Sequence, residues 1–440
     1  MKRHLVVIAA AAALLGEGLR AGPVPEDLPS PLDLKGAIRY ALDHNYAILQ
    51  AREAIRLQEG VIIQVKAQEI PNLAAQGQAQ RNDSSISALY PPATGLWNVE
   101  LTATQTLYAG GGVVSAVRGA RLARDAAAFD LQTAIDSALL DVRTKFFNVI
   151  LAREKIRVDE ESVRLYEHQL EDTKNQFQAG TVSNFEVLRA RVFLANAQPA
   201  LIAARNDYRI AIEQLRQSLG RTGAESFPEV AGDLSPVPSP GYDLAAAIAS
   251  AHEHRPELQK LQKLEDAGEE SVKTARSGFF PNLQAFGSYE WEGASYADSA
   301  LGNPSVNGWA FGLESTWHIF DGRATDGRVR QAKSQLEAAR LSKASEELEV
   351  DVEVRQALSS LQEAGELVDA SKQTIEQAAE DLRLADAKLH AGSATQLDVL
   401  TSQVSLTQAK TDQLTANYNY LVALANVRKA VGLSDALVIP

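Results

Sequence analysis

Three histidines are the first side chains in this sequence whose type and spacing suit chemistry. His44 and His254 occupy matching positions in two halves of the chain, and His252 stands two residues before the latter. Because neutral imidazoles bind metal ions, a metal site is one interpretation. We favour the other, in which these histidines lie near helix ends, where a cation suits the helix dipole. We therefore expect no bound metal.

A glycine run, Gly110–Gly112, precedes a long helical pattern, and glycines in such a place can cradle phosphate. No P-loop lysine follows the run, so we interpret it as a turn from strand to helix. The sequence also lacks an HExxH pair and a nucleophile elbow. These observations predict a protein that is not an enzyme and that needs no cofactor.

Two carboxylates at equivalent positions, Glu186 and Asp398, are the sharpest functional candidates. Each follows a glycine-containing turn and stands three residues after a hydroxyl residue, Ser183 or Thr395. That spacing is typical of a capping box, in which hydroxyl and carboxylate satisfy amides at a helix start. The alternative is that symmetric copies of the chain bring these carboxylates together at a closed mouth. Both interpretations require helices that begin close to these residues.

The element that organises the chain is one long helix, expected from about Val113 to Ala179. Apolar residues recur in it every seven positions, which is the spacing of a coiled-coil seam. The seam consists of Ala128, Ile135, Val142, Val149, Ile156, Val163, Leu170 and Phe177. Roughly 65 residues make a rod of about 100 Å, longer than an ordinary globular core. A second helix follows Gly180 at once, so the two must form an antiparallel hairpin.

The same pattern occurs twice, which is the strongest signal in the sequence. The seam returns 212 residues later, with Val354 in place of Val142, and Gly180 likewise matches Gly392. A repeat of this kind predicts two copies of one structural unit. We assign residues 32–220 and 242–433 to the repeats. Each opens with a helix, about 32–68 in the first, and each ends in a helical hairpin, at about 113–219 and 325–431. The proline-rich residues 221–241 are either a linker or a packed belt.

Each repeat also contains two strand-like stretches in which apolar and polar residues alternate with a period of two. The expected strands cover about 72–84, 95–108, 282–294 and 308–320. Aromatic residues mark their ends, which favours a membrane barrel with an interfacial girdle over a soluble sheet. The girdle candidates are Tyr90, Trp97, Tyr108, Tyr289, Trp291, Trp309, Trp317 and Phe320.

The composition and the first residues indicate an exported protein. Lys2 and Arg3 precede an apolar run, so we expect a signal peptide at residues 1–21, followed by a linker at 22–31. Residues 434–440 form a short tail. The chain contains no cysteine, which excludes disulfides and lipid attachment through cysteine. Its formal net charge of -13 argues against nucleic acid as the main partner.

Four strands cannot close a barrel, for which eight is about the practical minimum. An open sheet in hydrocarbon would leave unpaired backbone edges, and these are not tolerated there. The strands of several chains must therefore close one barrel, and the same chains must continue as a helical tube.

At this point the residues resemble those of the TolC family of outer-membrane efflux proteins. The likeness extends from about Leu32 to Leu433 and includes the segments 180–188, 212–217 and 392–400. It implies a mainly α, internally duplicated trimer in which a twelve-stranded outer-membrane β-barrel stands on a periplasmic α-barrel. It also implies a passive exit duct that is joined through a periplasmic adaptor to an inner-membrane pump of the RND or ABC type.

The resemblance also implies roles for residues near the hairpin turns. The matching family aspartate makes Asp398 the expected cation-binding residue of a periplasmic gate, together with Glu186. Leu389, Ala394 and Thr401 replace polar residues of the best-known family gate, so apolar contacts from Leu389 and Leu397 are expected to contribute to closure. The small turn residues would admit the adaptor's helical hairpin. They are Gly180, Thr181, Ser183, Gly392, Ser393 and Thr395.

Three alternatives stay open. The same duct could carry a secreted polypeptide rather than small molecules, and Glu100, Glu290 and Glu314 on the polar strand faces predict only an interior that favours cations. The chain could also be a non-conducting periplasmic coiled-coil scaffold, with its aromatic residues in a soluble core. A periplasmic adaptor also carries helical hairpins, but it would not be duplicated with strand pairs of this length.

Overall fold

Residues 28–83, 85, 89, 93–221, 226–239, 241–296 and 302–433 are described by the computed structural model. The expected signal peptide, most of the expected linker after it, the expected tail and the girdle candidate Tyr90 lie outside these residues.

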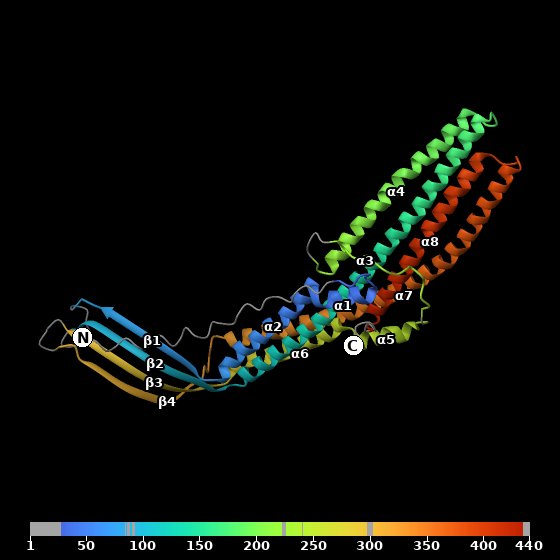
Figure 1. Ribbon diagram of the computed structural model, residues 1–440. Helices are drawn as coiled ribbons and strands as arrows, with labels where there is room; N and C mark the ends of the chain where they lie inside the picture. The colour runs from blue at the N-terminus through green and yellow to red at the C-terminus, as the bar shows by residue number, and fades with distance from the viewer. Residues whose placement is uncertain are drawn as a thin grey trace.

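The described chain folds as two similar units, each with a helix pair, a strand pair and a helical hairpin (Figure 1). The first unit contains α1 (Leu34–His44), α2 (Tyr46–Lys66), β1 (Asn72–Arg81), β2 (Ala93–Ala109), α3 (Gly112–Gln178) and α4 (Asn184–Ser218). The second contains α5 (Leu244–His254), α6 (Pro256–Arg276), β3 (Asn282–Tyr296), β4 (Ser305–Thr316), α7 (Ala324–His390) and α8 (Gln396–Ala430). The predicted fold class, with long helices, four strands and an internal duplication, is confirmed.

The helix that opens each repeat is broken, whereas the sequence predicted a continuous helix over about 32–68. Asn45 ends α1 and begins α2, and its side-chain oxygen accepts hydrogen bonds from the N–H groups of Ala47 and Ile48. Arg255 takes the same place between α5 and α6. Pro256 follows it, and a residue before proline is disfavoured in a helix. The break lets α1 and α5 turn across the long helices.

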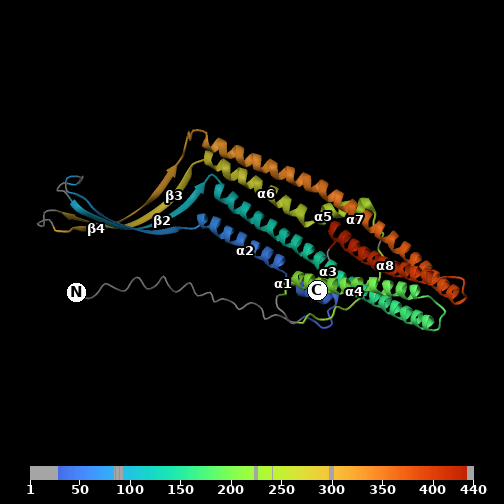
Figure 2. The ribbon, with the colours of Figure 1, turned by 90° about the horizontal axis from the view of Figure 1, so that it is seen from above.

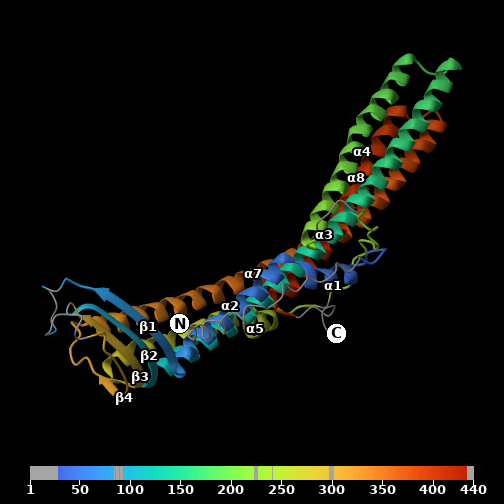
Figure 3. The same cartoon turned by 60° about the vertical axis from the view of Figure 1, so that its left-hand side comes forward.

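The two long helices α3 and α7 have 67 residues each and bury the predicted seam in part. Val142, Val149, Val354 and Leu361 are buried on it. The densest packing lies where α1 meets α3 and where α5 meets α7, in one apolar cluster per repeat. Figures 1 and 3 show the molecule bending close to these clusters, so that the hairpin tips point away from the line of the sheet.

The four strands form one antiparallel sheet in the order β1-β2-β3-β4. Successive residues alternate between two faces, so that Gln76, Glu100 and Glu290 share one face in a single cross-strand row. β4 ends at Thr316, four residues before the expected end. Its last partner is Asn282, and Pro281 before that has no N–H to continue the ladder.

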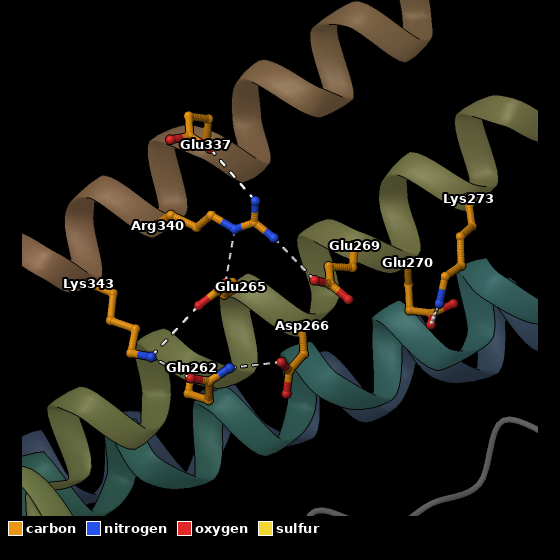
Figure 4. Close-up of polar contacts among 9 residues, drawn as sticks. All are labelled: Gln262, Glu265, Asp266, Glu269, Glu270, Lys273, Glu337, Arg340 and Lys343. Carbon is orange, nitrogen blue, oxygen red and sulfur yellow. Dashed lines mark hydrogen bonds and ion pairs between the residues drawn. The ribbon is translucent and has the colours of Figure 1, made fainter.

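The helices extend the sheet as one layer rather than as a compact bundle. Next to the sheet the order is α2-α3-α6-α7, and towards the tips it is α4-α3-α8-α7 (Figure 2). Arg340 of α7 lies 3.0 Å from Glu265 and 3.3 Å from Glu269, both on α6, which ties these two helices together (Figure 4). No helix in the described part of the chain is long and apolar enough to span a membrane.

The segment between the repeats packs as a belt. Val230 pairs with Leu32 in a parallel bridge, and both side chains are buried. Arg153 of α3 donates to the carbonyl oxygens of Val230 at 2.7 Å and Gly232 at 2.8 Å. The second of the two sequence interpretations therefore holds for residues 226–239.

Candidate functional site

Both hairpin turns lie at the end of the molecule opposite the sheet (Figure 1). Gly180 and Gly392 adopt the left-handed conformation, with φ of 78° and 72°, which ends α3 and α7. The hydroxyls of Thr181 and Ser393 donate to the last helix carbonyls, at 2.9 Å and 3.2 Å. A Cβ added at either glycine would meet no atom within 4 Å. The tips are therefore small and fixed in shape, and they are open on the outside.

The start of α8 contains the predicted capping box. The Asp398 carboxylate accepts hydrogen bonds from the backbone N–H of Thr395 at 2.7 Å and from its hydroxyl at 2.8 Å. These two hydrogen bonds hold the pKa of the Asp398 carboxyl below its ordinary value. The carboxylate is exposed and stays ionised at neutral pH.

The equivalent prediction for α4 is wrong, because the Ser183 side chain makes no capping hydrogen bond. Glu186 turns instead to Arg189, 3.0 Å away, and the Arg189 guanidinium lies 4.5 Å from the centre of the Phe185 ring. Since arginine holds a carboxylate in its fixed fork of donors, Glu186 is already neutralised within its own helix. The two carboxylates are equivalent in position but not in charge.

The other gate candidates lie around the start of α8 without meeting one another in a pocket. Leu397 is 41% exposed, and the Thr401 hydroxyl donates to its carbonyl oxygen at 2.8 Å. Leu389 is half-buried near the end of α7. A single chain therefore presents these side chains on a surface, and any constriction requires further copies.

Two contacts between the hairpins were not predicted. The Gln396 amide at the start of α8 donates to the hydroxyl of Thr173, a fully buried residue of α3. Further from the tip, Lys410 of α8 and Glu161 of α3 form an ion pair at 2.8 Å. These partners are more than 200 residues apart in the sequence, and no local pattern pairs them. They fix the position of α8 against α3 next to Asp398.

The outer face of the sheet carries the girdle candidates, at unequal heights. Trp97 lies over Gly293, and ten cross-strand rows separate this pair from Tyr108 and its partner Leu283. Ten residues at about 3.3 Å, in strands tilted by about 40°, span about 25 Å, the height of an outer-membrane apolar band. Trp97 and Tyr108 are thus spaced as two interfacial rings.

The remaining described girdle candidates depart from the expected positions. Tyr289, Trp291 and Trp309 cluster in the middle and upper part of β3 and β4, with the Tyr289 and Trp291 ring centres 4.3 Å apart. Trp317 and Phe320 lie beyond the end of β4, and the Trp317 ring N–H donates to the Phe279 carbonyl oxygen at 3.1 Å. Period-two alternation identified the face of these residues but not their height.

The histidines occupy the helix ends, as the favoured interpretation expected. His44 and His254 lie in the last turns of α1 and α5, where each ring nitrogen contacts a carbonyl oxygen of its own helix. His252 contacts Asp351 at 2.7 Å. Within the described residues no group of three or more histidine, aspartate or glutamate side chains is arranged to hold a metal ion.

Comparison with known proteins places this architecture. The family described as "Outer membrane efflux protein" matches residues 37–221 and 247–433, which are the two repeats. The Escherichia coli (strain K12) outer membrane protein TolC is 26% identical over 319 residues, covering 68% of this chain and 62% of that protein. The alkaline protease secretion protein AprF of Pseudomonas aeruginosa is 24% identical over 305 residues, with the same two shares. The chain thus matches less than two thirds of the length of these relatives.

A crystal structure of CusC, described in terms of transmembrane channel formation, superposes on the chain with a TM-score of 0.78. The alignment covers 91% of this chain and 92% of that one at 19% sequence identity. At this identity the likeness establishes the fold alone.

Proposed function

The chain belongs to the outer membrane efflux protein family, and from this premise we propose that three copies form the outer-membrane exit duct of a tripartite export system. In this proposal the twelve strands close a barrel in the outer membrane. The twelve long helical segments form a tunnel that extends into the periplasm. The duct conducts passively, and small molecules such as toxic compounds are its cargo.

The observation that carries the proposal is the open layer. β1 and β4 are both sheet edges, and their backbone groups need partners in a membrane. α4 and α7 are likewise the outer helices of the layer next to the tips, and large apolar side chains remain exposed along them. These are Leu188, Val192, Ile202 and Ile210 of α4, and Leu341, Leu348, Val352, Leu367 and Leu384 of α7. Further copies of the chain would cover both kinds of edge at once.

The partners follow from the same premise. The hairpin tips around Gly180 and Gly392 would receive a periplasmic adaptor, two tips per chain giving six docking grooves in a trimer. The adaptor would connect the duct to an inner-membrane transporter of the RND or ABC type, which supplies the energy. The outer face of the sheet, from Tyr108 to Trp97, would contact outer-membrane lipid.

A deletion strain and membrane fractionation test the proposal together. Loss of the gene should raise susceptibility to a set of toxic compounds, and the protein should appear in the outer-membrane fraction as trimers that dissociate on heating. Unchanged susceptibility together with a monomer in the periplasmic fraction would instead favour the non-conducting scaffold.

A second cargo class, a secreted polypeptide, is supported by one observation. The relative AprF is named for the secretion of a protease, and its match to this chain is as long as that of most of the first repeat and half of the second. A strain whose secreted proteins change on deletion, while its susceptibility does not, would favour this candidate.

Asp398 gives a prediction for the gate. We expect Asp398→Ala to weaken the block of single-channel current by divalent or trivalent cations, because three copies of this exposed and ionised carboxylate would face one another at the constriction. The lowered pKa of Asp398 should preserve the block in the wild-type protein down to about pH 4, the ordinary aspartate value. Planar-bilayer recordings with added cation measure both effects.

Two variants control this prediction. Glu186→Ala should leave the block unchanged, since Arg189 already neutralises that carboxylate. Asp398→Asn retains a side chain that can cap α8 but removes its charge, so it should behave as the alanine variant does. An unaltered block in both Asp398 variants would remove this residue from the gate.

A further inference from the structure

The internal duplication provides a template for a strand seam that a single chain leaves open. Residues of β1 correspond to residues of β3 at an offset of 210, and residues of β2 to residues of β4 at 212, since Gly77 pairs with Val99 as Gly287 pairs with Phe311. The seam between β1 and β2 therefore recurs between β3 and β4. The seam between β2 and β3 has no counterpart within the chain.

The length of β2 depends on that unmatched seam. β1 pairs with β2 only as far as Thr104, and residues 105–109 of β2 pair with β3 alone. In the second repeat β4 ends at Thr316, which is the equivalent of Thr104. The equivalents of residues 105–109 are residues 317–321, which lack a strand on that side. They expose 58% of Trp317 and 81% of Phe320.

We infer that β1 of the next copy pairs with β4 in the register of the β2–β3 seam, and that β4 then continues as a strand through residues 317–321. The inference rests on the proposed self-assembled duct. Translated through the two offsets, Thr102↔Ser288 becomes Glu314 opposite the next copy's Gln78, and Leu101↔Tyr289 becomes Leu313 opposite its Ala79. Gln105↔Ala285 becomes Trp317 opposite its Ala75.

Side-chain size on the outer face agrees with this register. The outward residues of β4 and its continuation are large, whereas those of β1 after Leu73 are Ala75, Gly77 and Ala79. Within the chain the same fit is already present, because the Trp97 indole lies where a Cβ at Gly293 would be, 2.5–2.8 Å from its ring atoms. Large residues of β4 would cover the small residues of the next copy's β1 in the same way.

Charge on the inner face agrees as well. Glu314 is a carboxylate on the edge strand, and the inward residues of β1 are Gln76, Gln78 and Gln80. The inferred register places the central glutamine opposite Glu314, so that amide N–H groups can donate to the carboxylate. Opposite partners and their diagonal neighbours are the pairs that interact across antiparallel strands.

Cysteine cross-linking tests the register, and the natural chain contains no cysteine to interfere. We would introduce Glu314→Cys with Gln78→Cys on the inner face and, separately, Leu313→Cys with Ala79→Cys on the outer face. Adjacent rows alternate between wide and close Cα spacing, so one of the two pairs has the closer one. After mild oxidation of the full-length protein in membranes, we expect most of the chain to migrate as a covalent trimer on a denaturing gel.

The matched controls combine Glu314→Cys with Gln76→Cys or with Gln80→Cys, each two residues from the inferred partner. Such diagonal Cα atoms lie about 7–8 Å apart, beyond the usual disulfide range, so cross-linking should be about tenfold lower. Trimers that are cross-linked by a control pair, and by neither inferred pair, would overturn the register while leaving the proposed duct intact. A chain that is monomeric in detergent and is cross-linked by no pair would overturn the duct itself.

Discussion

Replacing Gly180 with tryptophan is expected to abolish export while leaving the trimer intact. The glycine lies at an open tip where a new side chain would meet no atom of its own chain within 4 Å, so the indole would project into the space that an adaptor hairpin must enter. A loss of about 3 kcal/mol of docking free energy lowers affinity by more than a hundredfold. Susceptibility of a deletion strain carrying the variant gene measures export, and a heated and unheated gel reports assembly.

The control separates bulk from backbone strain. Gly180 has a φ of 78°, a conformation that asparagine tolerates better than most residues do. Gly180→Asn should therefore retain most of the export, because it keeps the turn without filling the groove. Wild-type export by the tryptophan variant, or equal loss in both variants, would argue against docking at this tip.

Replacing Arg255 with alanine is expected to cause the largest loss of stability. The Arg255 side chain is 5% exposed and forms ion pairs with Glu353 and with Glu257, the latter at 3.3 Å. Removing one partner of a buried pair is strongly destabilising. Since the Glu353 side chain is 46% exposed and regains water, we expect a smaller cost of about 2 kcal/mol. Amide hydrogen exchange in α5 and the start of α6 should then accelerate by about 30-fold.

The first repeat supplies the control for this prediction. At the equivalent position, the Asn45 side chain caps α2 and donates to the carbonyl oxygen of Ser218 at 2.7 Å. Arg255→Asn should therefore recover about 1 kcal/mol relative to Arg255→Ala, the usual contribution of a helix N-cap. Equal exchange rates in the two variants would show that the break in the second repeat does not accept the solution used in the first.

Periodicity in the sequence was sufficient to predict the elements that carry the function. A seven-residue repeat identified the hairpins, and a two-residue alternation identified the four strands and the inward face of Glu100 and Glu290. Both signals are local and occur in two copies. The capping box at Asp398 was predicted for the same reason, because its two partners are three residues apart.

What the sequence did not predict depends on partners far away in the chain or outside it. Glu186 has the spacing of a capping box, but Arg189 one turn later takes its carboxylate. Thr173 and Gln396 come from different repeats. The end of β4 at Thr316 is set by the end of its pairing with β3, so the strand expected to about residue 320 is complete only with a further copy. The gate, for the same reason, cannot be assembled from one chain.

Single-channel recording tests the central claim most directly. Protein purified in detergent and added to a planar lipid bilayer should produce discrete and uniform conductance steps, because three open layers close into one continuous pore. A protein that leaves the bilayer current unchanged at every voltage, although it is folded and oligomeric, would contradict the account.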